Sequence, residues 1–130
     1  MAVALPEPLK KLLDEPSFAT VATLMPDGSP HLSVVWVKRE GDTIVFSTVE
    51  GRRKQRNLAR DPRVSVLINP PDAPYTYGEV RGTATMTTEG GKELINELSR
   101  KYTGKDYTND GPDDVRVCVR ITPEKVVARF

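Results

Sequence analysis

The stretch 17-SFATVATLMPDGSPHLSVVWVKREGDTIVFSTV-49 decides the fold. It contains three runs rich in apolar and β-branched residues, which are typical of strands. Two turn signals separate these runs, PDGS at 26–29 and EGD at 40–42. Pairs of Gly with Asp supply the positive φ angles that tight hairpins need. We therefore predict three antiparallel strands in a meander, over 17–25, 30–40 and 42–49.

The rest of the chain adds three more predicted strands, over 63–69, 75–88 and 115–130. Helical spacing of apolar residues predicts helices over 7–15 and 89–102, and a short basic helix lies between Gly51 and Pro62. Gly78 and Gly82 indicate bends or bulges within the strand 75–88. The last strand alternates, which predicts an inward face of Val115, Val117, Val119 and Ile121 and an outward face of Arg116, Cys118 and Arg120.

These elements predict a mainly β fold: a six-stranded antiparallel sheet that closes into a small barrel, with two or three short helices outside. Closure removes the edge strands that a flat sheet would expose. The length of 130 residues fits a single domain over 1–130. Residues 1–16 contain prolines and acidic residues but no long apolar run, so we expect no signal peptide, no membrane span and a cytoplasmic protein.

The charge balance excludes a general attraction to polyanions. The chain carries 19 basic and 18 acidic residues, a net charge of +1, so any anion site must be local. We expect neither nucleic acid nor a membrane surface as a partner. A small barrel that binds nucleic acid through its basic helix is the weaker alternative, and steep salt dependence of such binding would support it.

Cations crowd the first turn of the basic helix in 47-STVEGRRKQRNLARDP-62. A helix N-terminus already carries about half a positive charge, so Arg52, Arg53 and Lys54 lie where the backbone disfavours cations. One interpretation is a solvated surface helix with Leu58 turned to the core. The other is a phosphate monoester or diester at residues 51–54, which would satisfy the free N–H groups, the helix dipole and the cations together.

Other candidate ligand contacts lie on the neighbouring strands. Trp36 is the single tryptophan, and the strand around it is apolar on both faces from 32 to 37, which predicts a second subunit over the outer face. Ser47 and Thr48 end the next strand beside the basic turn and offer hydroxyl groups. Tyr75 and Tyr77 are either stacking partners for a planar ring or ordinary strand aromatics.

No catalytic constellation is recognisable in the sequence. The chain has one histidine, His31, and one cysteine, Cys118, and it has no triad, no metal-ligand cluster and no glycine-rich phosphate motif. We therefore predict no catalytic side chain and no metal site. If the protein is an enzyme, a cofactor carries the chemistry.

The order TVATLMPDGSPHLSVVWV, DTIVFSTVEGRRKQRNLARDPRVSVLI and YGEVRGTATM resembles the flavin-reductase-like split β-barrel superfamily, which includes the pyridoxamine 5′-phosphate oxidases. It looks most like the short actinobacterial deazaflavin (F420)-dependent oxidoreductases. The resemblance covers about residues 8–128. Its most specific motif is R-x-K-x-R-N-L followed by D-P-R, here with Arg52, Lys54, Arg56, Asn57 and Leu58.

The resemblance implies a split barrel and a homodimer with two cofactor sites between the subunits. It implies that Arg52 and Lys54 bind the cofactor phosphate. F420 carries an acidic extension beyond its phosphate, and we expect Arg53 or Arg56 to help to hold it. The resemblance also places a ring and its ribityl chain along Ser33, Val34, Val35, Trp36, Ser47 and Thr48, with Tyr75 and Tyr77 contributed by the second subunit.

The implied activity is hydride transfer from reduced F420 to a small unsaturated or electrophilic substrate. The alternatives are an FMN-dependent oxidase or reductase on the same barrel, and a carrier that binds F420 or flavin without turnover. F420 and FMN share a ribityl phosphate and a three-ring system, so the sequence separates them poorly. It names no substrate, and it assigns no role to the loop 103–114.

Overall fold

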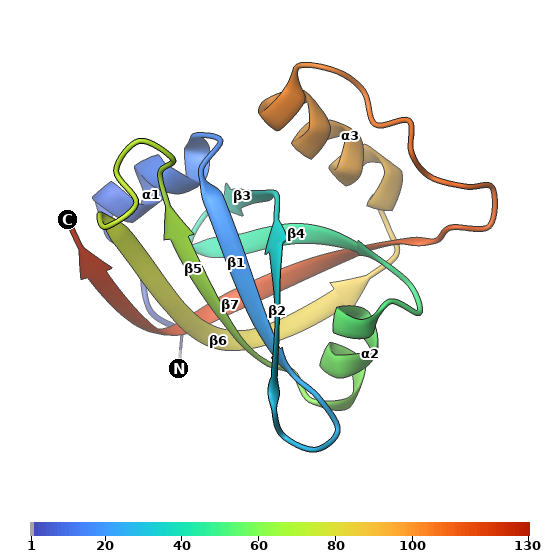
Figure 1. The fold of residues 1–130 in the computed structure, drawn as a ribbon, viewed down its shortest axis with the longest axis horizontal. Helices are drawn as coiled ribbons and strands as arrows, with labels where there is room; N and C mark the ends of the chain where they lie inside the picture. Colours follow the sequence, from blue (N-terminus) through green and yellow to red (C-terminus); the bar gives the residue numbers. More distant parts are fainter. Residues whose placement is uncertain (1) are drawn as a thin grey trace.

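A computed structural model describes residues 2–130. Seven strands and three helices follow one another along the chain (Figure 1). Their bounds are α1 (Glu7–Asp14), β1 (Phe18–Leu24), β2 (Pro30–Val35), β3 (Val37–Glu40), β4 (Thr43–Val49), α2 (Arg53–Arg60), β5 (Arg63–Asn69), β6 (Tyr77–Thr87), α3 (Gly91–Thr103) and β7 (Arg116–Arg129).

All strands belong to one antiparallel sheet, in the order β2-β1-β5-β6-β7-β4-β3. The two edge strands, β2 and β3, are consecutive in the chain, and Trp36 alone separates them. The sheet therefore curls until its edges approach each other at Trp36, as the ribbon shows (Figure 1). The predicted mainly β barrel is confirmed. The count of strands differs by one because the predicted strand 30–40 breaks at Trp36.

The concave face of the sheet holds the core. Residues of β1 and β5 alternate between buried and accessible positions, whereas β4 is buried on both faces because α3 covers its outer side. Val21, Phe46, Ile68 and Val119 are at most 1 % exposed. Full burial of such a side chain stabilises the fold by about 1.5–3 kcal/mol. This alternation puts Val64, Val66 and Ile68 of β5 on the inner face.

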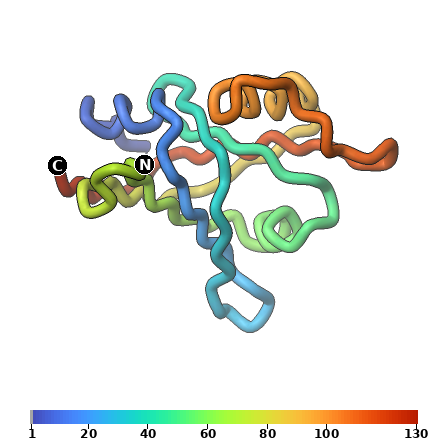
Figure 2. Tube along the Cα trace, turned by 45° about the horizontal axis from the view of Figure 1, so that its top comes forward, coloured from blue at the N-terminus to red at the C-terminus, as the bar shows by residue number. Residues whose placement is uncertain are grey.

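The helices cover different parts of the barrel (Figures 1 and 2). Helix α1 lies at the end where the two chain termini meet, and it buries Leu9, Leu12 and Leu13. Helix α2 lies beside β1 and β4, near the opposite end, and α3 lies over β4 and β7. None of the helices in residues 2–130 is long and apolar enough to cross a membrane.

The two glycines that matter most to this arrangement lie on β6 and α3. The register of β6 with β7 shifts between Arg81 and Gly82, which confirms the predicted bulge there. Gly91 opens α3, and a Cβ atom at this position would lie 2.6 Å from the backbone oxygen of Arg116. The absence of a side chain at Gly91 thus lets α3 pack directly on the start of β7.

We expect Gly91→Ala to lower the free energy of unfolding by about 1–3 kcal/mol, the usual cost of overpacking a close contact. Alanine is otherwise the better helix former, so a loss of stability would report the clash rather than helix propensity. Chemical denaturation measures the change. Gly111→Ala is the matched control, because its nearest neighbour would lie 3.7 Å away. Equal stability of both variants would refute the close approach.

Candidate functional site

A cavity of about 250 Å³, called here the basic cavity, opens between the end of β2, the end of β4 and the start of α2. Six of its lining residues are ones that the sequence singled out: Val34, Val35, Trp36, Ser47, Arg52 and Lys54. Four others come from later in the chain, namely Ile95, Leu98, Tyr107 and Arg116. The meander and the basic helix therefore meet at one place.

The cationic end of the basic cavity lacks a counter-ion. Arg52 is the N-cap of α2, and this helix has no side-chain cap and no acidic residue in its first turn. The pKa of Lys54 is lowered, first by burial and second by the nearby charge of Arg52. Among residues 2–130, neither Arg52 nor Lys54 forms an ion pair. Two cations that form no ion pair thus line the cavity at the start of α2, an arrangement that suits an anion.

Trp36 forms the aromatic wall of the basic cavity. Its ring stacks on Tyr102 with centroids 5.6 Å apart and planes 17° apart, and it meets Tyr107 edge-on at 6.2 Å. Such pairs add about 0.5–1.5 kcal/mol beyond the area they bury. The tryptophan is therefore held between α3 and the loop that follows it.

Side chains of the last turn of α3 form hydrogen bonds with the backbone of Val37. The backbone N–H of Val37 donates to the Tyr102 hydroxyl at 3.3 Å, and the Lys101 ammonium donates to the Val37 carbonyl at 2.6 Å. Lys101 also donates to the Leu13 carbonyl at the end of α1, and the Tyr102 hydroxyl donates to the Ser17 carbonyl at 2.8 Å. These contacts join α1, α3 and the sheet edge at Val37.

Four of the predicted site residues lie elsewhere around α2. Asn57 is fully buried, and its side-chain amide donates to the Thr23 hydroxyl at 3.0 Å, so it attaches α2 to β1. Thr48 is 1 % exposed and faces the barrel interior. Arg53 and Arg56 lie on α2 but do not line the basic cavity. The interior position of Thr48 follows from alternation, since Ser47 takes the cavity side.

Ser33 also faces away from the basic cavity. It pairs with Val21, which is 1 % exposed, so both side chains lie on the inner face of the sheet. Its hydroxyl oxygen is buried without a hydrogen-bond partner among residues 2–130, as is that of Thr48. Ser33 and Thr48 therefore lie on the side of the sheet opposite the basic cavity, which their sequence neighbours Val34 and Ser47 line.

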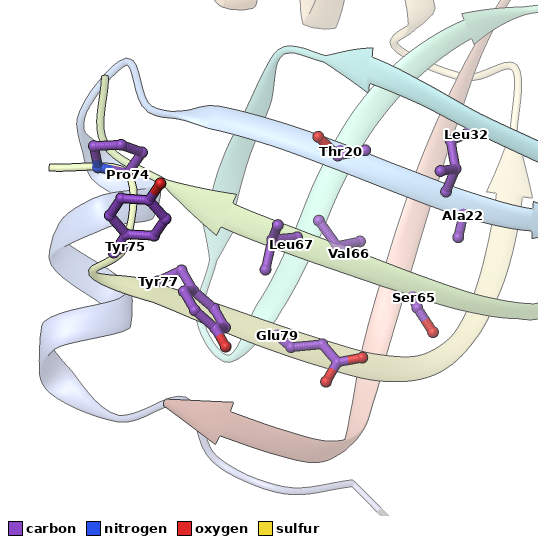
Figure 3. Close-up of a pocket in the computed structure, with 10 residues that line it drawn as sticks. All are labelled: Thr20, Ala22, Leu32, Ser65, Val66, Leu67, Pro74, Tyr75, Tyr77 and Glu79. Carbon is purple, nitrogen blue, oxygen red and sulfur yellow. The ribbon is translucent and has the colours of Figure 1, made fainter. Parts of the chain in front are cut away.

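A second depression, called here the apolar groove, lies on the outer face of β2, β1, β5 and β6 and has a volume of about 590 Å³ (Figure 3). Tyr75 and Tyr77 line it together with Leu32 and Leu67. Tyr75 precedes β6 and is 91 % exposed. Within one chain, the two tyrosines therefore lie apart from the basic cavity. Leu32 and Val34 share the outer face of β2 and are 63 % and 69 % exposed, so they connect the apolar groove with the basic cavity.

Arg116 was not predicted as a site residue, and its burial was not foreseen. It lies on the outer face of β7, as alternation predicted, but it is 6 % exposed, whereas Val115, predicted to face inward, precedes β7 and is 41 % exposed. The reason is that α3 and the loop 104–115 cover the start of β7 from outside. A carboxylate in that loop, Asp110, accepts two hydrogen bonds from the guanidinium, so the charge is buried with its partner.

The comparisons with known proteins agree with this architecture. The family model described as pyridoxamine 5′-phosphate oxidase matches residues 5–130. The chain therefore belongs to the pyridoxamine 5′-phosphate oxidase family. A pyridoxine/pyridoxamine 5′-phosphate oxidase from Rubrobacter xylanophilus is 36 % identical over 90 residues, which are 64 % of this chain and 38 % of that relative. The match thus spans well under half of the relative's length.

Two solved structures are similar over nearly the whole chain. One, titled F420 reductase, has a TM-score of 0.82 and 28 % identity, and the match covers 95 % of this chain and 98 % of that one. The other, a conserved hypothetical protein from Mycobacterium tuberculosis, has a TM-score of 0.76 and 29 % identity, with 96 % and 84 % covered. The split barrel is thus shared along its full length.

Lys101 provides a test of how the wall is held. Burial lowers the pKa of Lys101 to about 8 from its ordinary value of 10.5, against the attraction of Asp14 and Glu97, which pair with Arg39 and Lys38. Between these two pH values the unfolded chain binds more protons than the folded protein. The contribution of Lys101 to the free energy of unfolding must therefore rise as the pH rises through this window.

We expect the wild type to gain stability relative to Lys101→Met between pH 7 and pH 9.5, measured by denaturation at several pH values. The neutral amine still has two N–H groups for its two carbonyl acceptors, so the emission maximum of Trp36 in the wild type should not shift over this range. A stability difference that stays constant with pH would show that Lys101 is not buried as described.

Proposed function

We propose that this protein is an oxidoreductase that binds F420 and uses the reduced form to reduce a small unsaturated or electrophilic substrate. The observation that carries the proposal is the pair of uncompensated cations, Arg52 and Lys54, beside the N-terminus of α2 and the aromatic wall of Trp36. The similarity to the structure titled F420 reductase supports the choice of the deazaflavin.

The residues of the basic cavity fit a ribityl phosphate. A phosphate accepts hydrogen bonds at all its oxygens, and the cavity offers two cations, the free N–H groups of α2 and the Ser47 hydroxyl. Trp36, Val34 and Val35 would flank a planar ring. When bound, reduced F420 supplies the hydride, and the protein supplies position and shielding.

Apart from arginine, the titratable side chains in the described lining of the basic cavity are Lys54 and Tyr107. None of its ten residues in the described chain is a histidine, a cysteine or a carboxylic acid. In this proposal the proton that accompanies the hydride comes from solvent. Arg52 and Lys54 bind the phosphate, Ser47 donates to it, and Trp36 excludes water from one side of the ring.

FMN is the alternative cofactor, because it carries the same phosphate and a similar ring, and the family takes its name from oxidases. A carrier that binds either cofactor without turnover is the non-enzymatic alternative. It predicts tight binding with no reduction of any acceptor by the bound cofactor. Arg53 and Arg56 favour F420, since they place additional cations on α2 for an acidic tail.

We also propose that a second copy of the chain completes the site. The basic cavity, at about 250 Å³, is smaller than the 300–1,000 Å³ typical of cofactor pockets. The outer face of β2 is apolar and exposed at Leu32 and Val34, and it leads from the basic cavity to the apolar groove. A copy seated on this face would cover Val34 and bring its own Tyr75 and Tyr77 toward the cofactor.

The phosphate site is tested with Lys54→Ala and Arg52→Ala. Loss of one charged partner costs about 1.5–3 kcal/mol, so each variant should bind F420 or FMN roughly 10- to 150-fold more weakly. The apo variants should be as stable as the parent or slightly more so, because these cations oppose the helix dipole. Quenching of Trp36 fluorescence by the cofactor gives the affinity, and thermal unfolding gives the stability.

Lys11→Ala on α1 is the matched control and should change neither quantity. Arg56→Ala separates the two cofactors, because it should weaken F420 and leave FMN unaffected. If Lys54→Ala and Arg52→Ala keep full affinity but lower the stability of the apo protein, the basic turn is structural and the phosphate site lies elsewhere.

The dimer is tested with Leu32→Asp, which places a charge on the outer face of β2. Sedimentation of the parent should give about twice the chain mass of 14.4 kDa, and the variant should sediment as a monomer with weaker cofactor binding. Val3→Asp, at an apolar position that is 37 % exposed and lines neither cavity, is the control. A parent that sediments as a monomer and still binds cofactor at full strength would remove the second copy from the site.

A further inference from the structure

Arg116 is the most deeply buried charged side chain that lines the basic cavity, with 4 % of its side chain exposed. Its Nε and Nη2 atoms donate to the Asp110 carboxylate at 2.9 and 2.7 Å. The ring of Tyr107 lies 4.8 Å from the guanidinium carbon, and Gly91 brings α3 against the backbone. Asp110 and Tyr107 therefore fix the guanidinium, and α3 covers the backbone and Cβ of Arg116.

The free end of this guanidinium reaches a cavity residue. Its Nη1 atom donates to the Ser47 hydroxyl oxygen at 3.3 Å, across the pairing of β4 with β7. A serine hydroxyl has one proton and two lone pairs. Arginine has only donors, so it occupies one lone pair of Ser47 and leaves the proton and the second lone pair, which favours the hydroxyl as a donor. Within residues 2–130, the Ser47 hydroxyl forms no other side-chain hydrogen bond.

The charge of Arg116 is balanced by the Asp110 carboxylate. Arg116 lowers the pKa of Asp110 through its hydrogen bonds, so the carboxylate stays ionised and cancels the charge of Arg116. The charge of Arg52 also acts on Asp110, but neither Arg52 nor Lys54 forms an ion pair in the described chain. The excess positive charge of the basic cavity therefore lies mainly on the α2 side, because Asp110 is hydrogen-bonded to Arg116.

We propose that Arg116 is a positioning residue, which Asp110 holds in place and which commits the Ser47 hydroxyl to act as a donor toward the ligand. Such a donor selects a group that only accepts hydrogen bonds, such as a phosphate, and disfavours a ligand that presents an N–H or O–H at this point. The inference rests on the proposed function, because it assumes that the anion occupies the basic cavity.

A double-mutant cycle tests the inference, with FMN and F420 as probes and Trp36 quenching as the readout. Ser47→Ala and Arg116→Met should each weaken binding by about tenfold, the value for one hydrogen bond to a charged group. The double variant should bind no more weakly than Arg116→Met alone, because Ser47 loses its commitment once the arginine is absent. Ser47→Ala combined with Lys54→Ala is the matched control pair, and its effects should multiply.

Arg116→Met also leaves Asp110 without its partner and is expected to unfold at a lower temperature. All titrations are therefore made well below the melting temperature of each variant, and Asp110→Asn provides a second test. It frees Arg116 from its anchor without removing the guanidinium, so it should reduce the effect of Ser47→Ala, whatever the change in affinity that follows from the loss of one negative charge. Arg116→Lys, which keeps one donor, should recover part of the affinity.

Independent, multiplicative effects of Ser47→Ala and Arg116→Met would overturn the inference, as would a Ser47→Ala variant with full affinity. In either case a weakened Lys54→Ala variant would leave the proposed function intact. Failure of the parent protein to bind both probes would overturn the proposed function and the inference together.

Discussion

The structure depends on how the chain passes from one edge of the sheet to the other at Trp36. Strands β2 and β3 are the two edges, and a single residue joins them. An edge exposes unpaired N–H and C=O groups, and Val37 shows how they are satisfied here, because its N–H and its carbonyl bond to Tyr102 and Lys101. The same crossing places the indole against α3 and in the wall of the basic cavity. Barrel closure and the site thus share one segment.

Electrostatics explains why the basic turn points to a ligand rather than to the fold. Several cations of the chain form ion pairs, such as Arg39 with Asp14 and Arg116 with Asp110. Arg52 and Lys54 form none in the described chain, and they line a cavity in which Lys54 is half-buried. Keeping cations at a helix N-terminus without an anion has a cost of about 0.3–1 kcal/mol each. A bound phosphate would reverse the sign of that contribution.

The sequence predicted the elements that depend on local signals. The signals for the hairpin turns at Asp27-Gly28 and Gly41-Asp42 and for the basic helix before Pro62 all act over a few residues, and the structure confirms these elements. Trp36 was not predicted as a break, because the residues on both sides are apolar and β-branched and so look like one strand. Arg116 was placed on the correct outer face but its burial was not predicted, because alternation takes no account of a helix that covers this face.

In the candidate site, too, the residues that the sequence predicted are those near a local signal. The cavity residues from β2, β4 and α2 lie within or close to the basic motif that begins at Arg52. Tyr107 and Arg116 reach the cavity through the loop 104–115 and the packing of α3, which no local pattern encodes. One signal was available: the loop before β7 is rich in aspartate, and a buried arginine needs a carboxylate partner.

The central claim is that the basic cavity holds the phosphate end of a deazaflavin or flavin beside Trp36. Titration of the purified protein with F420 and FMN side by side, followed by the fluorescence of its single tryptophan, tests this most directly. We expect saturable quenching of Trp36 fluorescence with one equivalent of cofactor per chain, and tighter binding of F420 than of FMN. Unchanged Trp36 emission at saturating concentrations of both cofactors would contradict it.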